Sequence, residues 1–394
     1  MSTQAVIVIA ADKFKGSATA EEVAVALKRG LRSTISPAEV RCVPVADGGE
    51  GTVDAAISAG FKRQITRVTG PIGEPIDAAW AMHTSSDGID AVVELAQASG
   101  IELLETSRLT GATATSRGTG ELLQAALDAG ATRITLGLGG SACTDGGAGM
   151  LAALGVELLD QNGKHLADGG AALQHLDQVN LTGLDPRWMH TKLVLASDVE
   201  NPLLGHEGAA AVFGPQKGLT GHDVVMLDAA LGHYAQLLTE ATERDFGLDA
   251  GQSVADHVAQ PGAGAAGGAG FGAMAVLRAQ RRSGIDVILD LVGFADALAD
   301  ADLVITGEGS LDAQTLQGKA PAGVAQLASQ QRIPVYAVCG RNLLSTAETE
   351  AAGITRVFAL TELEPDPDVS MRQTPSLLTQ VGEQIGDILL AQPA

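Results

Sequence analysis

Residues 5–46 read AVIVIAADKFKGSATAEEVAVALKRGLRSTISPAEVRCVPVA, and this stretch decides the fold. The apolar runs AVIVIA (5–10) and VRCVPVA (40–46) predict buried strands, and EEVAVALKRGL (21–31) between them has the apolar spacing of an amphipathic helix. A strand, a helix and a second strand in this order form a βαβ unit with two parallel strands. The chain is therefore predicted to begin as a doubly wound α/β domain.

The same alternation closes the chain, which indicates that both ends belong to one mostly parallel sheet. Its predicted strands and helices are LVIT (303–306), APAGVAQLASQQ (320–331), PVYAVCG (334–340), a short helix near 346–352, TRVFALT (355–361) and a last helix near 376–390. The middle of the chain has its own strand and helix patterns. We therefore expect two dissimilar α/β domains, one made of residues 1–75 plus 290–394 and the other inserted as residues 76–289, with the active site in a cleft between them.

The composition excludes several classes of protein. The formal net charge of −22 would repel nucleic acid and anionic lipid surfaces, so neither is expected as a partner. There is no signal-peptide pattern and no apolar run long enough to span a membrane, which predicts a cytoplasmic protein. The three cysteines form no CxxC pair, so neither a disulfide framework nor a zinc site is indicated.

Charged residues recur in glycine-containing loops where predicted strands end. AADKFKGSATAEE (10–22) places Lys15 before a predicted helix start, where an anion binds readily, although solvated lysines on an ordinary turn would look the same. PVADGGEGT (44–52) places Asp47 at the end of the next strand, where open α/β sheets bind their ligands. A plain Asp-Gly turn is the alternative reading of that stretch.

The loop GLGGSACTDGGAG (137–149) has the most glycine. Its GxGxxA spacing matches a dinucleotide fingerprint only weakly, because the loop continues well past the point where the helix should start. The exposed backbone N–H groups of such a loop suit a polyphosphate instead. We therefore predict that Gly139, Gly140, Ser141 and Thr144 bind phosphate and that Asp145 holds a metal ion or positions a group.

Three further stretches carry candidate residues. ASDVENPLLGHEG and FGPQKG offer Asp198 as an acid and Lys217 as a phosphate ligand, and ITGEGSLDAQTLQGKAP offers Glu308 and Asp312 for a metal and Lys319 for a phosphate. Arg341 and Arg117 are competing candidates for a substrate carboxylate, and each could equally be a surface residue. PGAGAAGGAG (261–270) follows no strand, so it is either a backbone cradle or a hinge between domains.

Taken together and in this order, these stretches resemble the signature motifs of the type 1 bacterial glycerate kinase family over almost the whole chain. Lys13 departs from the family pattern, whereas Lys15 follows it. The resemblance implies phosphorylation of D-glycerate by ATP with Mg²⁺, usually at the 2-hydroxyl, and two dissimilar α/β domains.

Phosphoryl transfer requires phosphates to be held and an acceptor hydroxyl to be placed near a base. We expect Lys15, Lys217 and Lys319 to hold the triphosphate, Asp198 and Glu308 with Asp312 to carry Mg²⁺, and Asp47 or Asp198 to accept the hydroxyl proton. Three alternatives remain open at this point: phosphorylation at the 3-hydroxyl or of another small hydroxy acid, a non-catalytic nucleotide- or metabolite-binding regulator, and a dehydrogenase.

Overall fold

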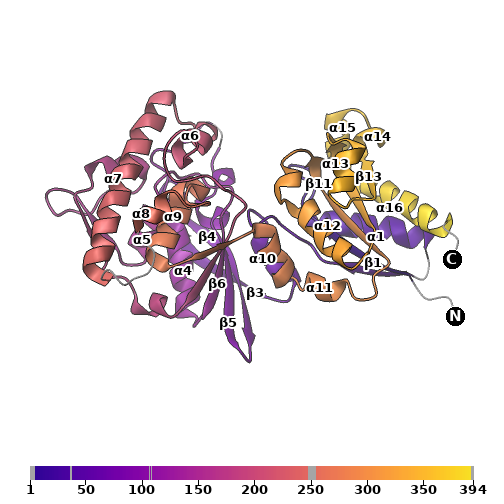
Figure 1. Cartoon of the computed structure of the whole chain (residues 1–394), viewed down its shortest axis with the longest axis horizontal. Coiled ribbons are helices and arrows are strands. Elements are labelled where there is room, and N and C mark those ends of the chain that lie inside the picture. The colour runs from indigo at the N-terminus through magenta and orange to yellow at the C-terminus, as the bar shows by residue number, and fades with distance from the viewer. Residues whose placement is uncertain (1–4, 36–37, 106, 108, 247–253, 392–394) are drawn as a thin grey trace. The chain divides into compact units, whose positions relative to one another are not determined.

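The computed structural model describes residues 5–35, 38–105, 107, 109–246 and 254–391, and Figure 1 labels its elements. The chain divides into two compact units. Unit 1 comprises residues 1–47, 54–59 and 283–394, and unit 2 comprises residues 48–53 and 60–282. The boundary expected at 75/76 would separate β3 (Lys62–Thr69) from β4 (Pro75–Ser85), and these strands pair antiparallel along their length.

Unit 1 is built on a five-stranded sheet in the order β13-β12-β11-β1-β2, and all four pairings are parallel. This confirms the predicted doubly wound parallel sheet formed by both chain ends. The strands are β1 (Ala5–Ala11), β2 (Ala38–Cys42), β11 (Leu303–Leu311), β12 (Val335–Asn342) and β13 (Arg356–Ala359).

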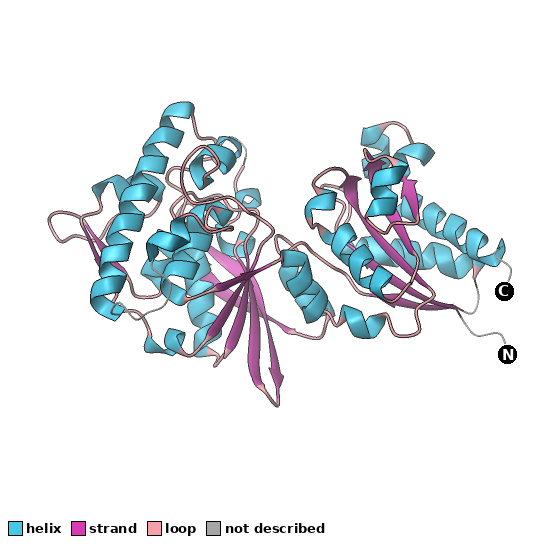
Figure 2. Cartoon of the chain, viewed as in Figure 1, coloured by secondary structure: helices cyan, strands magenta, loops and turns pink. Residues whose placement is uncertain are grey.

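Helices cover both faces of this sheet (Figure 2). On one face Ile7 and Ile9 pack against α1 and α16, and on the other Val8 and Ala10 pack with α10 and α12. The helices of unit 1 are α1 (Ala20–Thr34), α10 (Gly284–Leu291), α11 (Phe294–Ala297), α12 (Ala320–Gln330), α13 (Thr346–Ala351), α14 (Leu360–Leu363), α15 (Pro367–Arg372) and α16 (Thr374–Ala391), with the 3₁₀ helix η6 (Thr315–Gln317). α2 (Thr52–Ser58) begins in unit 2 and continues in unit 1.

Helix α1 starts at a capping box, in which Thr19 accepts from the backbone N–H of Glu22 and the Glu22 side chain accepts from that of Thr19. Its first turn therefore begins at a fixed distance after β1. Further along, Gly30 lets α1 approach α16 closely, because a Cβ there would lie 2.0 Å from the carbonyl oxygen of Thr379. The loop 12–18 is thus held between a buried strand and an anchored helix.

Strand order reverses between β1 and β11. From β1 the chain first adds β2 on one side, and β11 later pairs with the other side of β1. In open α/β sheets the carboxyl ends of the strands flanking such a switch point form the usual ligand site. In unit 1 Asp12 directly follows β1, and Glu308 lies near the carboxyl end of β11.

Unit 2 contains a six-stranded sheet in the order β10-β9-β6-β5-β4-β3 and a separate antiparallel pair, β7-β8. β3, β4 and β5 are antiparallel, whereas β5, β6, β9 and β10 are parallel, so the sheet is mixed. The remaining strands are β5 (Gly88–Glu94), β6 (Arg133–Gly137), β7 (Glu157–Leu159), β8 (Gln178–Asn180), β9 (Lys192–Ala196) and β10 (Gln280–Arg282).

One large hydrophobic core joins the sheet of unit 2 to its helices, including Trp80 on β4 and Phe271 on α9. The α-helices are α3 (Ala96–Ser99), α4 (Arg117–Asp128), α5 (Ala148–Ala153), α6 (Ala209–Phe213), α7 (Gly221–Phe246), α8 (Val254–Val258) and α9 (Ala265–Leu277). Short 3₁₀ helices cover η1 (Ile101–Leu103), η3 (Gly170–His175), η4 (Pro186–Met189) and η5 (Pro215–Lys217). No helix in the described parts of the chain combines the length and apolarity needed to cross a membrane.

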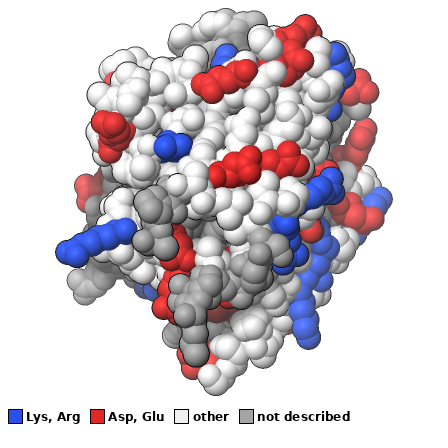
Figure 3. Space-filling view, turned by 90° about the vertical axis from the view of Figure 1, so that its right-hand side faces the viewer, with Lys and Arg blue, Asp and Glu red and all other residues white. Residues whose placement is uncertain are grey.

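On the face shown in Figure 3, carboxylates lie among uncharged residues, and several lysine and arginine side chains lie together toward the lower right. Acids outnumber lysines and arginines 47 to 25 in the whole sequence, which gives the formal net charge of −22.

Candidate active site

A cavity of about 490 Å³ opens at the switch point of unit 1. Its polar wall comes from the loops after β1 and β2, from the ends of β11 and β12 and from the segment after β11. Its apolar wall comes from the loop after β1 and from α14 and α15. The titratable residues that line it are Asp12, Lys13, Lys15, Asp47, Glu308, Asp312, Lys319 and Arg341, and the apolar ones are Phe14, Leu360, Pro367 and Met371.

The pairing of β1 with β2 and β11 places three acids, Asp12, Asp47 and Glu308, near the switch point. Asp12 donates its backbone N–H to the carbonyl of Gly307 at 2.9 Å, so the residue after β1 lies beside Glu308 on β11. The chain after β2 continues along β1, with Val43 donating to Ile9 and Val45 to Ala11, and this brings Asp47 to the same end of the sheet. Parallel strands therefore collect three carboxylates at one edge.

Burial and the charges of neighbouring acids raise the pKa values of Asp12 and Glu308. Burial raises the pKa of Asp12 to about 7, and the neighbouring charges of Asp47 and Glu308 act in the same direction. Burial also raises the pKa of Glu308, although a hydrogen bond from the Thr315 hydroxyl to Oε1 at 2.5 Å and the charge of Lys319 oppose the shift. A carboxyl group with a pKa near 7 is well matched to proton transfer at neutral pH.

Cationic side chains line the same cavity. Lys15 is exposed on the loop after β1, and Lys319 occupies the N-cap of α12, where the positive end of the helix dipole adds to its charge. Arg341, at the end of β12, donates from Nε to the hydroxyl of Ser310 at 3.0 Å. The cavity thus presents both the acids and the cations that a metal phosphate and an organic acid would require.

The donor set fits magnesium held together with a phosphate. Within the described residues, no three His, Cys, Asp or Glu side chains converge to hold a metal ion by themselves. Mg²⁺, however, is usually bound by one or two carboxylates plus substrate phosphates and water. Glu308 and Asp312 line the cavity with Lys319, and this pair of carboxylates matches that mode of binding.

In unit 2, the glycine-rich loop after β6 is mostly buried. Gly139 and Gly140 retain exposed surface, whereas every residue from Ser141 to Met150 is buried. The Asp145 carboxylate is fully buried and accepts hydrogen bonds from Ser116 N–H (2.9 Å), Ser116 Oγ (2.8 Å), Gly147 N–H (3.1 Å) and Gly149 N–H (3.2 Å). These donors give Asp145 a structural role in place of the predicted contact with a metal ion.

Lys217 is also internal, with 1% of its surface exposed. Its ammonium group donates to Ser141 Oγ at 2.8 Å and to the carbonyl of Cys143 at 2.6 Å, and burial lowers its pKa to about 8. The predicted phosphate contacts of Lys217 and Ser141 are therefore replaced by contacts with each other. Thr144 is fully buried as well, which corrects the prediction that it touches a phosphate.

Burial of this loop explains the second glycine-rich stretch. Ala266, Gly267 and Gly268 have left-handed backbone conformations within α9, and Gly267 accepts from the N–H of Gly146 at 3.0 Å. A Cβ on Gly267 would lie 2.1 Å from the carbonyl oxygen of Cys143. Residues 261–270 are thus a packing partner of the loop 143–147, a role that differs from both the cradle and the hinge considered from the sequence.

Arg117 and Asp198 also lie in unit 2. Arg117 forms a forked ion pair with Asp168, with Nε to Oδ2 at 2.8 Å and Nη2 to Oδ1 at 2.9 Å, so its guanidinium already holds a carboxylate of the chain itself. Arg117 lies outside the cavity of unit 1, which Arg341 lines, and its role at the substrate carboxylate stays a prediction. Asp198 follows β9 and is partly buried, and its role as metal ligand or proton acceptor stays a prediction.

Comparison with known proteins identifies the family. The model of the glycerate kinase family matches residues 7–390. The chain belongs to the glycerate kinase family. It is 45% identical to the glycerate kinase of Bacillus subtilis strain 168 over 355 residues and 44% identical to the glycerate 2-kinase of Escherichia coli K12 over 356 residues, with 90% of each chain covered in both alignments.

A solved structure agrees in fold with this member of the glycerate kinase family. The crystal structure of a protein from Salmonella typhimurium LT2, described as a candidate glycerate kinase 2, superposes with a TM-score of 0.81 at 39% identity and covers 99% of both chains. The family resemblance read from the sequence motifs is therefore confirmed, together with the α/β fold class and the assignment to kinases.

Within this family member, the cavity of unit 1 unites six of the predicted site residues: Lys15, Asp47, Glu308, Asp312, Lys319 and Arg341. The residue missing from that prediction is Asp12. Its position after a strand was visible in the sequence, but its importance depends on the register that places it beside Glu308. Pairing of residues so far apart in the chain is not encoded in local sequence pattern.

Proposed function

We propose that the chain transfers the γ-phosphoryl group of ATP to the 2-hydroxyl of D-glycerate, giving 2-phosphoglycerate and ADP with the help of Mg²⁺. The observation that carries the proposal is the cavity at the switch point of unit 1, which combines carboxylates with lysines and an arginine. The position of the hydroxyl follows the printed name of the Escherichia coli relative, a glycerate 2-kinase.

Lys15 and Lys319 are proposed to hold the phosphates. Both line the cavity, and Lys319 stands at the N-terminus of α12, where the helix dipole favours an anion. Arg341 is proposed to bind the glycerate carboxylate, since a guanidinium fork matches a carboxylate in shape and charge. Its Nε bond to Ser310 fixes the direction of the guanidinium before substrate arrives.

Glu308 and Asp312 are proposed to hold Mg²⁺, which would neutralise the charge developing on the phosphoryl oxygens. Glu308 on β11 and Asp312 just after this strand belong to a segment, 308–315, that is held by its own hydrogen bonds. Thr315 Oγ1 donates to Glu308, the N–H of Asp312 donates to Thr315 Oγ1 at 3.0 Å, and the N–H of Gln314 donates to the Asp312 carboxylate at 2.9 Å. Two carboxylates on such a segment need little rearrangement to bind a cation.

Asp12 is proposed to accept the proton of the attacking hydroxyl. In this step the hydroxyl oxygen forms a bond to the γ-phosphorus, the bond from phosphorus to the bridging oxygen breaks, and ADP leaves with that electron pair. Asp12 lines the cavity between Asp47 and Glu308, so a proton taken there also relieves their repulsion. Asp47, which the sequence suggested for this role, is its neighbour and the natural alternative.

The test is product analysis with the full chain. With D-glycerate, ATP and Mg²⁺ present, we expect release of ADP and a phosphorus NMR signal of 2-phosphoglycerate. A signal of 3-phosphoglycerate would overturn the position of attack and leave the kinase assignment intact. Nucleotide binding without glycerate-dependent ADP release would instead support a regulator.

A further inference from the structure

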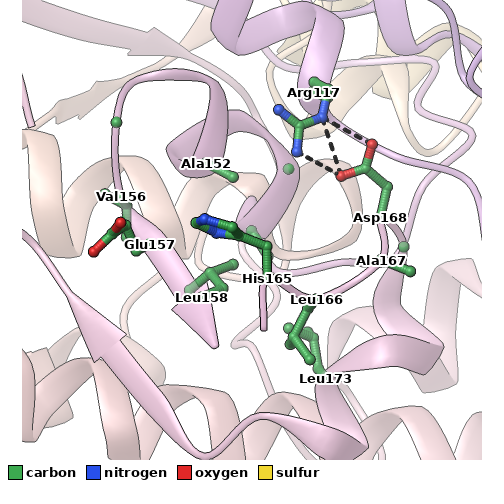
Figure 4. Close-up of a pocket in the computed structure, with 14 residues that line it drawn as sticks. Arg117, Ala152, Val156, Glu157, Leu158, His165, Leu166, Ala167, Asp168 and Leu173 are labelled. Atoms are coloured by element: carbon green, nitrogen blue, oxygen red, sulfur yellow. Dashed lines mark hydrogen bonds and ion pairs between the residues drawn. The ribbon is translucent and has the colours of Figure 1, made fainter. Parts of the chain in front are cut away.

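A second cavity, of about 340 Å³, lies within unit 2. It is formed by the start of α4, by α5, by the strand β7 and by the loop 165–169, and none of its lining residues belongs to the cavity of unit 1 (Figure 4). Its volume is at the lower end of the range typical of small-molecule sites, about 300–1,000 Å³.

The polar end of this cavity is the Arg117–Asp168 pair. Each of the two side chains is 31% exposed, so solvent and ligands can reach them. The pair uses Nε and Nη2 of Arg117, and Nη1 has no hydrogen bond to any described residue. Figure 4 shows this third nitrogen turned away from Asp168. A guanidinium donor is therefore available, fixed in direction by a carboxylate that the chain itself supplies.

The other open polar groups carry the opposite charge or none. Each oxygen of Asp168 can accept further hydrogen bonds beyond those from Arg117. Glu157 lies on β7 at the side of the cavity, and its carboxylate accepts a hydrogen bond from the side-chain amide of Asn180 at 2.7 Å. His165 is exposed, and its ring has no hydrogen bond within the described part of the chain.

The charges select the class of ligand. Because Asp168 already neutralises Arg117, and Glu157 adds a negative charge, a simple anion would gain little net attraction here. A ligand with one charge of each sign satisfies both kinds of group. The opposite wall is apolar, with Leu158 and Leu173 buried beneath Ala152 and Leu166, so the remainder of such a ligand would be a short hydrocarbon.

We propose that this cavity is a second ligand site, separate from the proposed phosphoryl-transfer site, and that it takes a zwitterionic α-amino acid with a small apolar side chain. The ligand carboxylate accepts from Nη1 of Arg117, the ammonium group donates to Asp168, and the side chain packs on Leu158 and Leu166. Arg117 is one residue from Ser116, which binds Asp145, so an occupied site would brace the buried glycine-rich loop.

The test is thermal unfolding of the full chain during titration with glycine, L-alanine, L-valine and L-leucine. Single-charge analogues of valine are the matched ligands: isovalerate lacks the ammonium group, and isobutylamine lacks the carboxylate. A ligand that binds only the folded state raises the unfolding temperature in a concentration-dependent way. We expect a saturable rise in the millimolar range for at least one of the apolar amino acids and none for either analogue.

Two variants locate the binding. Arg117→Lys keeps an ion pair to Asp168 but removes the third guanidinium nitrogen, and it is expected to weaken amino-acid binding by about 10-fold or more. Ala152→Leu fills the cavity without touching its polar groups and should abolish binding. Ala347→Leu, at an exposed position of α13, is the control for an added leucine and should bind as the unchanged chain does.

Three results would contradict the proposed amino-acid site. No saturable shift with any of the four amino acids would overturn the site. An equal shift with isovalerate would show an anion site and contradict the zwitterion. Unchanged binding in both Arg117→Lys and Ala152→Leu would place the ligand elsewhere.

Discussion

Asp12 lies beside Glu308 because β1 and β11 pair in parallel, with Ala11 opposite Gly307 and the N–H of Asp12 bonded to the Gly307 carbonyl at 2.9 Å. Two carboxylates at neighbouring strand ends repel each other unless a cation or a proton lies near them. The candidate active site therefore favours binding of a cation or a proton between Asp12 and Glu308. The first two predictions follow from that relationship.

Asp12→Asn is expected to lower kcat by about 10²–10⁴-fold, the usual contribution of a general base. The variant should fold well, because it removes a buried charge that Asp47 and Glu308 disfavour. Steady-state release of ADP and thermal unfolding measure the two effects. Glu350→Gln, at an exposed site on α13, is the control. Near-normal turnover of Asp12→Asn would exclude Asp12 as the proton acceptor.

The stability of the chain should depend on pH through Asp12. Its folded pKa of about 7 lies above the ordinary value of 3.8, so between these two values the folded state binds more protons than the unfolded state. The contribution of Asp12 to the free energy of unfolding therefore falls as pH rises from about 4 to about 7, by at most about 1.4 kcal/mol per pH unit.

This pH dependence is isolated by comparing the unchanged chain with Asp12→Asn, without Mg²⁺ or nucleotide. The free energy of unfolding from urea titration should favour the variant increasingly as pH rises through that window. Above about pH 7 the difference should stay constant. Parallel curves across the whole window would show that Asp12 titrates normally.

Arg341→Ala is expected to raise the KM for glycerate by about 10–100-fold, as for loss of a hydrogen bond between charged groups, with a smaller effect on the KM for ATP. Arg356→Ala is the matched control, because Arg356 is exposed on β13 and lies over the ring of Tyr336, 5.9 Å from its centroid. Initial rates at varied glycerate and varied ATP separate the two constants. A change confined to the KM for ATP would reassign Arg341 to the nucleotide.

Asp145→Asn should destabilise the chain by about 3 kcal/mol or more, since a neutral amide replaces a buried carboxylate that accepts four hydrogen bonds. Urea unfolding at constant pH measures the loss. Asp177→Asn, at an exposed position, should change little. If Asp145→Asn kept its stability and lost only affinity for Mg²⁺, the structural role would be wrong and the metal role right.

Local pattern was sufficient to predict much of unit 1. The run AVIVIA became β1, the helix expected near 346–352 is α13, and the last helix expected near 376–390 is α16. The spacing of apolar residues shows which face of a helix or strand is buried, so these elements can be predicted from their own residues. The predicted strand 40–46 begins and ends earlier in the structure, as β2 (Ala38–Cys42), although Val43 and Val45 still donate to Ile9 and Ala11.

The functions of glycine and of single charges could not be predicted in the same way. The same residues, Ser141 to Gly147, would suit a phosphate cradle or a buried packing loop, and only the presence of α9 against them decides. Lys217 looked like a surface phosphate ligand, yet its partners are Ser141 and the Cys143 carbonyl. Arg117 likewise forms an ion pair with Asp168, which lies 51 residues further along the chain and belongs to no motif shared with Arg117.

The pairing of β1 with β11 also has a consequence for how the molecule is made. Ile7 of β1 pairs with Leu303 of β11, so one edge of β1 stays unpaired during synthesis until about 300 residues have emerged. Unit 2 lies almost wholly between these two strands in the sequence, and its local contacts can form first. A ribosome that stalls before β11 would therefore leave an N-terminal segment with an open strand edge, in which Asp12 and Asp47 are present without Glu308.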